Sequence, residues 1–195
     1  MKFILALFLV STTVIAQTTF VIKGSLPTVV NESIQLLGYS GLHTFSLGQT
    51  TTDASGNFNL SYPEDYIGVA VLQIKDHASV HLLLNKENFS LEWNNLKDIG
   101  NLKITSSNEN KYFNTGFAIF QETETKLAPL KYLQPLYKGE PQKQTWVNTE
   151  INELTKKNED FLNGISNTSY AYYFLKNKKF VSDLADLAQK NQEQI

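Results

Sequence analysis

The chain has 195 residues, a net charge of −2 and no cysteine. The small net charge gives no reason to expect a nucleic acid or an anionic surface as partner. The absence of thiols excludes disulfides, cysteine catalysis and lipid attachment through cysteine within these residues. All basic residues apart from histidine are lysines, so the planar fork with which arginine clamps phosphate is missing as well.

The first sixteen residues have the pattern of a secretory leader. Lys2 supplies the positive end, residues 3–10 form an apolar run, and the small residue Ala16 stands at the expected cut, in the order that leaders require. A membrane anchor is the alternative, but a span needs about 20 apolar residues, and polar residues interrupt the run from Ser11 onward. We therefore expect a signal peptide at 1–16. The mature protein is expected to be exported to the periplasm or cell envelope, with no transmembrane span after cleavage.

Residues 17–105 alternate apolar and polar side chains in short runs separated by Gly, Pro, Asn and Asp, which is typical of strands with one buried face. Eight strands are predicted, at 19–24, 33–38, 43–51, 57–62, 68–75, 80–84, 89–93 and 102–105. The spacings leave no room for crossover helices, so an antiparallel β-sandwich or small barrel is expected. Its expected core contains Ile34, Leu36, Phe58, Leu60, Val69, Val71, Leu82, Leu84, Leu91 and Trp93.

One turn can be read in detail. Asp53 and Gly56 suit the first and fourth positions of a type I turn, which predicts a hairpin corner. The alternative is a calcium loop, because Asp53, Ser55 and Asn57 stand at alternate positions, as oxygen ligands do. The glutamate that would close such a loop, Glu64, comes directly after Pro63. The turn is therefore favoured.

From residue 106 onward the apolar spacing becomes helical. Ser106 and Glu109 have the pattern of a capping box, and the helix that they begin is expected to stop before Pro129. A loop is expected from there to Gly139, and Pro141 suits the first turn of a second helix. The second helix is the most regular, with a stripe of residues that is expected to pack on a neighbouring helix: Val147, Ile151, Leu154, Asn158, Phe161 and Ile165.

Asn158 is expected to set the register of that packing, and Gly164 to end the second helix. Asn167 or Thr168 is expected to cap a third helix and Ser182 a fourth. Residues 106–195 are thus predicted to form a segment of about four helices, and the whole chain an α+β protein. The fourth helix is still in phase at Ile195, so we expect more chain to follow in the intact protein.

Three histidines are the first candidates for chemistry. His77 and His81 have a spacing that binds zinc on a helix, but here they flank a predicted strand without a third ligand nearby, and His43 stands alone. No Gly-x-Ser-x-Gly elbow and no phosphate-binding Gly-Lys-Ser/Thr loop occurs in the chain. We therefore assign no catalytic, cofactor-binding or metal-binding residue, and no cofactor.

A cluster of aromatic side chains is the other candidate, since such faces stack on sugars. Tyr170, Tyr173 and Phe174 share one helical face and are expected in the core, which leaves Tyr172 outside. Trp93 and Trp146 lie elsewhere in the sequence. A glycan groove lined by these side chains remains an alternative.

Several segments resemble a known family: 20–24, 34–39, the 52–58 corner, and 80–85 before 89–91. They look like the DUF4369 type of β-domain, which in Bacteroidetes often stands at the N-terminus of exported thioredoxin-like proteins of the TlpA and AhpC/TSA kind. The resemblance covers about residues 18–112, and the helical remainder looks like the spacer before the thioredoxin module. The Trp-Cys-x-x-Cys motif of those proteins is missing here, so no catalytic residue is carried over.

Three functional hypotheses follow. The preferred one is a non-catalytic module of the cell envelope that positions or recruits an envelope protein or a thioredoxin-like module in cis. The second is the N-terminal portion of a thiol-disulfide oxidoreductase whose redox domain lies beyond residue 195. The third is a glycan-binding module.

Overall fold

The computed structural model describes the backbone of residues 19–192 and the side chains of residues 19–184. The leader predicted at 1–16 lies outside the described residues. So do the side chains of residues 185–192 and all of residues 193–195, which include Ile195 of the predicted fourth helix.

The first part of the chain forms two four-stranded sheets that enclose one apolar core. Sheet A has the strand order β4-β1-β7-β8 and sheet B the order β3-β2-β5-β6. The strands are β1 (Thr19–Ser25), β2 (Ser33–Ser40), β3 (His43–Thr51), β4 (Asn57–Pro63), β5 (Gly68–Ile74), β6 (Ala78–Leu84), β7 (Phe89–Trp93) and β8 (Leu102–Thr105). A short 3₁₀ turn, η1 (Ile99–Asn101), precedes β8. The eight predicted strands are confirmed, with ends that differ by two residues at most.

The pairing differs from the prediction in one place. All ladders are antiparallel except that between β1 and β7, which is parallel and aligns Ile22 with Phe89. A parallel pair needs a long connection, and here sheet B and β4 supply it, since the chain forms them between β1 and β7.

The predicted core is confirmed at most of its positions but wrong on β5. Val69 and Val71 are only half-buried and face outward, while Ala70 and Leu72 are fully buried in the sandwich. The strand is apolar on both faces because the helices cover part of the outer face of sheet B, where Val69 packs. Alternation cannot assign the inner face of such a two-sided strand.

The turn predicted at 53–56 is confirmed. The Asp53 carbonyl accepts a hydrogen bond from Gly56 N–H (3.0 Å), and Gly56 has φ +78°. Backbone N–H groups of Asn57 and Ser55 donate to the Asp53 carboxylate, which lowers its pKa. The turn joins β3 of sheet B to β4 of sheet A, however, so it is a corner between sheets and not a hairpin.

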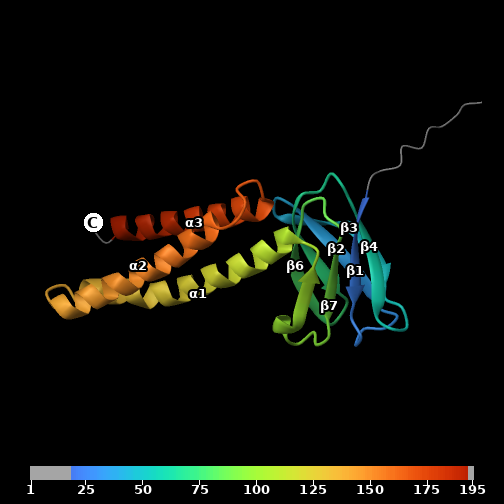
Figure 1. Ribbon diagram of the computed structural model, residues 1–195, viewed down its shortest axis with the longest axis horizontal. Coiled ribbons are helices and arrows are strands. Elements are labelled where there is room, and N and C mark those ends of the chain that lie inside the picture. Colours follow the sequence, from blue (N-terminus) through green and yellow to red (C-terminus); the bar gives the residue numbers. More distant parts are fainter. Residues whose placement is uncertain (1–18, 193–195) are drawn as a thin grey trace, which may run out of the picture.

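Within residues 19–192, three helices form an arm that projects from the β-domain, where about four were predicted (Figure 1). They are α1 (Asn108–Leu136), α2 (Pro141–Asn163) and α3 (Tyr170–Gln192). α1 leads away from the sandwich, α2 returns and α3 runs outward again (Figure 1). None of the helices in the part of the chain that the structure describes has the length and apolarity needed to cross a bilayer.

Two predicted helix ends are wrong. α1 passes through Pro129 and ends only at Leu136, and Ser182 lies inside α3 instead of starting a new helix. Proline removes one intrahelical donor and bends a helix, and at the exposed position of Pro129 the helix continues past it. Gly164 does follow the last residue of α2, as predicted.

The helices pack on one another through a glycine and a pair of polar side chains as well as through apolar side chains. Gly116 of α1 lies against both other helices, since a Cβ there would meet Leu175 of α3 at 2.3 Å and Phe161 of α2 at 2.6 Å. Thr123 Oγ1 donates to Asn158 Oδ1 across a buried 3.0 Å contact. The predicted role of Asn158 in the register of α2 is consistent with this pair.

At the surface, hydrogen bonds from Lys126 and Lys157 lower the pKa of Glu122 to about 2.

Replacing Gly116→Val tests the close packing of the arm. The added methyl groups have no space between Leu175 and Phe161, so we expect the free energy of unfolding to fall by about 1–3 kcal/mol, measured by chemical denaturation. Gly164→Ala is the matched control, because the nearest atom to a Cβ there is 3.4 Å away and its φ is −85°. Equal stability of the two variants would contradict this account of the packing.

Candidate functional site

Four strands lie at sheet edges: β4 and β8 in sheet A, β3 and β6 in sheet B. An edge strand presents backbone N–H and C=O groups that no neighbouring strand satisfies. The way in which each edge is closed or left open determines where the β-domain is able to take up a partner.

A side chain closes the edge at β6. Asn110 of α1 is fully buried; its amide oxygen accepts from Leu83 N–H (2.8 Å), and its amide nitrogen donates to the Leu83 carbonyl (2.8 Å). A side-chain amide offers the same donor and acceptor as a peptide group. Asn110 therefore takes the place of a neighbouring strand at this residue.

The capping box predicted for the start of α1 is wrong. Ser106 has φ +64°, and the N-cap is the next residue, Ser107, whose Oγ accepts from Asn110 N–H at 3.0 Å. The same Oγ donates to the Glu87 carboxylate, which ties the cap to the loop after β6. Because the helix begins one residue later than predicted, Glu109 does not face Ser106.

Glu109 caps a different helix. Its buried carboxylate accepts from the backbone N–H groups of Tyr170 (3.0 Å) and Ala171 (2.8 Å) at the start of α3, and from Asn85 Nδ2 (2.7 Å). Negative charge is favourable at a helix N-terminus. Ser169 adds a second cap by accepting from Tyr172 N–H, so the caps predicted at Asn167 and Thr168 are wrong.

Apolar contacts complete this joint between sandwich and arm. Val69 and Leu83 on the outer face of sheet B pack in one cluster with Phe113 of α1 and Ala171 of α3. The ring of Phe174 meets that of Phe113 edge-on, with centroids 5.2 Å apart. The arm is therefore held by hydrogen bonds at the edge of β6 and by side-chain packing beside it.

Both edges of sheet A are protected. β8 has only four residues and carries the exposed Lys103, and short charged edges resist further pairing. β4 comes against β3: a Cβ added to Gly48 would lie 2.3 Å from the Ser61 carbonyl oxygen. β4 also ends at Pro63, which has no N–H to donate.

β3 shares the contact at Gly48 with β4, but its residues 43–47 carry neither a lysine nor a proline that would protect the edge. It has nine residues, among them no lysine, aspartate, glutamate or proline, and most of its side chains are exposed. Phe45 is 44% exposed. Sheet order places β3 at the edge of sheet B opposite β6, so the open edge is the one away from the arm.

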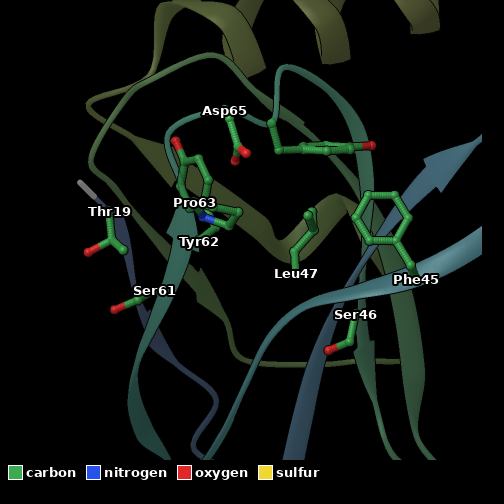
Figure 2. Close-up of a pocket in the computed structure, with 9 residues that line it drawn as sticks. Thr19, Phe45, Ser46, Leu47, Ser61, Tyr62, Pro63 and Asp65 are labelled. Atoms are coloured by element: carbon green, nitrogen blue, oxygen red, sulfur yellow. The ribbon is translucent and has the colours of Figure 1, made fainter. Parts of the chain in front are cut away.

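A hollow of about 540 Å³ lies beside this edge (Figure 2). In the figure, the side chain of Leu47 lies between that of Phe45 on one side and those of Thr19 and Ser61 on the other. The residues that line the hollow are Thr19, Phe45, Ser46, Leu47, Ser61, Tyr62, Pro63, Asp65 and Tyr66. They come from three strands and the segment after β4.

Tyr66 forms a fixed wall of the hollow. Its hydroxyl donates to the Val69 carbonyl (2.6 Å) and accepts from Tyr39 N–H (3.0 Å), where the ladder between β2 and β5 ends. Burial raises its pKa. Its ring meets that of Phe45 edge-on at 5.8 Å and lies over Gly38, where a Cβ would come within 2.7 Å of it.

Tyr62 is held in the same way. Its hydroxyl donates to the Glu87 carbonyl (2.6 Å) and accepts from Glu87 N–H (3.1 Å). Burial raises its pKa to about 12. Both phenols of the hollow thus stay protonated near neutral pH and are engaged with backbone groups, so they contribute ring faces to the hollow and no free hydroxyl.

Asp65 is the charged residue in the lining. Its side chain is exposed and, within the described part of the chain, has no hydrogen bond or ion pair. Glu64 beside it is paired with Lys86 instead. A ligand in the hollow therefore meets one free negative charge at its rim.

The structure places all three histidines at exposed positions. His81 lies on the exposed outer face of β6, His77 in the turn before that strand and His43 at the start of β3. Across the described ranges, no three side chains of His, Cys, Asp or Glu are grouped so as to hold a metal ion. The calcium-loop alternative at 53–57 is also disfavoured, since Asp53 Oδ1 already accepts two backbone hydrogen bonds of its own turn.

The aromatic cluster is arranged differently from the prediction. Tyr173 is 54% exposed, while Tyr172 is half-buried against the helix core, because the inward face of α3 is centred on Ala171 and Leu175. Trp93 is 2% exposed and donates through Nε1 to the Asp98 carbonyl. It therefore has no free face for stacking on a sugar.

A second hollow, of about 590 Å³, lies along α3, with Glu124 of α1 and its partner Lys178 among its lining residues. Neither hollow was found from the sequence, because each is assembled from separated segments. The sequence did contain one signal for the open edge beside the first hollow. Residues 43–51 have the pattern of a long strand without lysine, aspartate, glutamate or proline.

Comparisons with known proteins assign no family. No protein-family model and no curated protein matches the chain. A solved structure, 9R-lipoxygenase from Cyanothece PCC8801, aligns at 14% identity with a TM-score of 0.27, over 39% of this chain and 16% of the lipoxygenase chain. An alignment of that score carries no inference about fold or function.

Replacing Asn110→Ala tests the joint at β6. The substitution removes the amide oxygen and nitrogen that bond the N–H and carbonyl of Leu83, and leaves these backbone groups in place. We therefore expect a loss of about 2–3 kcal/mol in the free energy of unfolding. Amide hydrogen exchange at Leu83 should accelerate. Asn114→Ala, at an exposed position of the same helix, is the control and should change neither quantity; unchanged exchange at Leu83 in Asn110→Ala would contradict the assignment.

Proposed function

We propose that this protein is an exported module of the cell envelope that binds a protein partner through its β-domain and positions it relative to the helical arm, without catalysis of its own. The observation that carries the proposal is the open edge of β3 beside a hollow with fixed walls. Polar and apolar groups converge there, as in binding sites.

The rest of the molecule supports a positioning role. The joint holds α1 and α3 to sheet B by hydrogen bonds from Asn110 and Glu109 to backbone groups. Apolar side chains of sheet B and of the helices also pack together beside these hydrogen bonds. A partner bound at β3 would be held at a set direction from the arm.

Export is supported by the leader pattern at 1–16. The resemblance to DUF4369 domains supports an accessory role beside a thioredoxin-like module, whether that module lies in the same chain or in a partner. A thiol-disulfide activity would belong to that module, since these residues contain no cysteine.

Site-specific photo-cross-linking in the producing cells tests the proposal. A benzophenone amino acid is placed at Thr44 of β3 or, as control, at Glu153 of α2, both of which are exposed. We expect an envelope protein of defined mass linked from Thr44 and not from Glu153, competed by unlabelled protein in isolated envelopes. Mass spectrometry of the same material should find the mature chain beginning at Gln17. Equal adducts from both positions, or none from Thr44, would argue against the function.

A further inference from the structure

The open edge and the hollow together indicate what kind of ligand is bound. We propose that β3 takes up an extended peptide segment of the partner as a further strand of sheet B, with alternate side chains in the hollow and a lysine or arginine beside Asp65. This inference rests on the proposed function, because it names the way in which the β-domain holds its partner.

The backbone of β3 supplies the first part of the recognition. In an edge strand, alternate residues direct N–H and C=O groups away from the neighbouring strand, and an added strand satisfies them. β2 covers one side of β3, and no strand of the described chain pairs with the other. The contact of Gly48 with Ser61 closes one end of β3, which leaves residues 43–47 for a new strand over about 16 Å.

A bulge in β3 provides the second part of the recognition, which involves side chains. The register with β2 shifts so that Leu36 faces Gly48 and Leu37 faces Ser46, which makes Leu47 the extra residue. Bulges redirect a side chain and limit how far an edge extends. Leu47 is aimed into the hollow beside Tyr62 (Figure 2). A strand added to sheet B would place every second side chain over this surface.

Charge distinguishes a foreign peptide from a second copy of the chain. Asp65 at the rim has no ion-pair partner among the described residues, and the lining of the hollow contains no lysine. β3 of a second copy would bring no cation either, because residues 43–51 have none apart from the histidine. A lysine- or arginine-bearing segment therefore fits this edge better than self-pairing does.

Selection from a heptapeptide phage library on the mature chain tests the inference. We expect selected peptides to alternate β-branched or aromatic residues with others and to carry one lysine or arginine at a recurrent position. On binding a synthetic copy of such a peptide, those amides of residues 43–47 that point away from β2 should become protected from hydrogen exchange. Binding strength is measured by fluorescence anisotropy.

Two variants test the contribution of charge. Ser46→Lys should weaken binding about tenfold, since it places a like charge beside the peptide's cation, whereas Asn59→Lys on the exposed face of β4 should not. Asp65→Asn should weaken binding about two- to fivefold, as expected for an exposed ion pair. A peptide with glutamine in place of the cation should bind wild type and Asp65→Asn equally.

Three outcomes would overturn strand addition: no peptide selected, selected peptides that leave the 43–47 amides unprotected, or a concentration-dependent dimer that Ser46→Lys abolishes. The last would identify a second copy as the occupant. Specific cross-links from Thr44 to an envelope protein together with unprotected β3 amides would leave the proposed function standing and refute strand addition alone.

Discussion

The joint between the two halves of this protein depends on a buried side-chain amide. Asn110 bonds both backbone groups of Leu83 at 2.8 Å, at an edge that the helices cover. Leaving either group buried and unpaired would cost about 1–3 kcal/mol, so α1 has to begin where Asn110 reaches β6. Glu109, the preceding residue, then receives the first N–H groups of α3. Two adjacent side chains thus set the starting points of two helices.

This joint makes sheet B asymmetric. Its β6 edge is bonded at Leu83 by a side chain of the arm, whereas its β3 edge has no strand of the described chain beside residues 43–47 and lies next to a hollow. Natural sheets usually protect long edges with charges, prolines or short strands, and sheet A does so with Lys103 and Pro63. β3 has only its bulge at Leu47. The two edges of sheet B thus differ, since the arm bonds β6 at Leu83 and no helix or strand of the described chain bonds the outer side of residues 43–47 of β3.

Local patterns predicted the strands well, because alternation and turn residues act over a few positions. They could not assign strands to sheets: the turn at Asp53 has the same residues whether it closes a hairpin or a corner. They also misplaced Val69 and Val71, since β5 is apolar on both faces. Glu109 satisfied the spacing of a capping box, yet its carboxylate bonds the start of α3. The two residues that it bonds there, Tyr170 and Ala171, come 61 and 62 positions later in the chain. The hollow was beyond such patterns, because its lining is assembled by tertiary packing.

The order of sheet B has a mechanical consequence for binding at its edge. Its strands are linked by ladders in the sequence β3, β2, β5 and β6, and β6 is linked through Leu83 to Asn110 of α1. A strand added to β3 would extend this series of hydrogen bonds by one member. Each link is perpendicular to the strands, and shear along the strands loads all bonds of a ladder together. A partner held in this way would be coupled to the arm through backbone bonds and one buried amide, without the need for any contact between partner and helices.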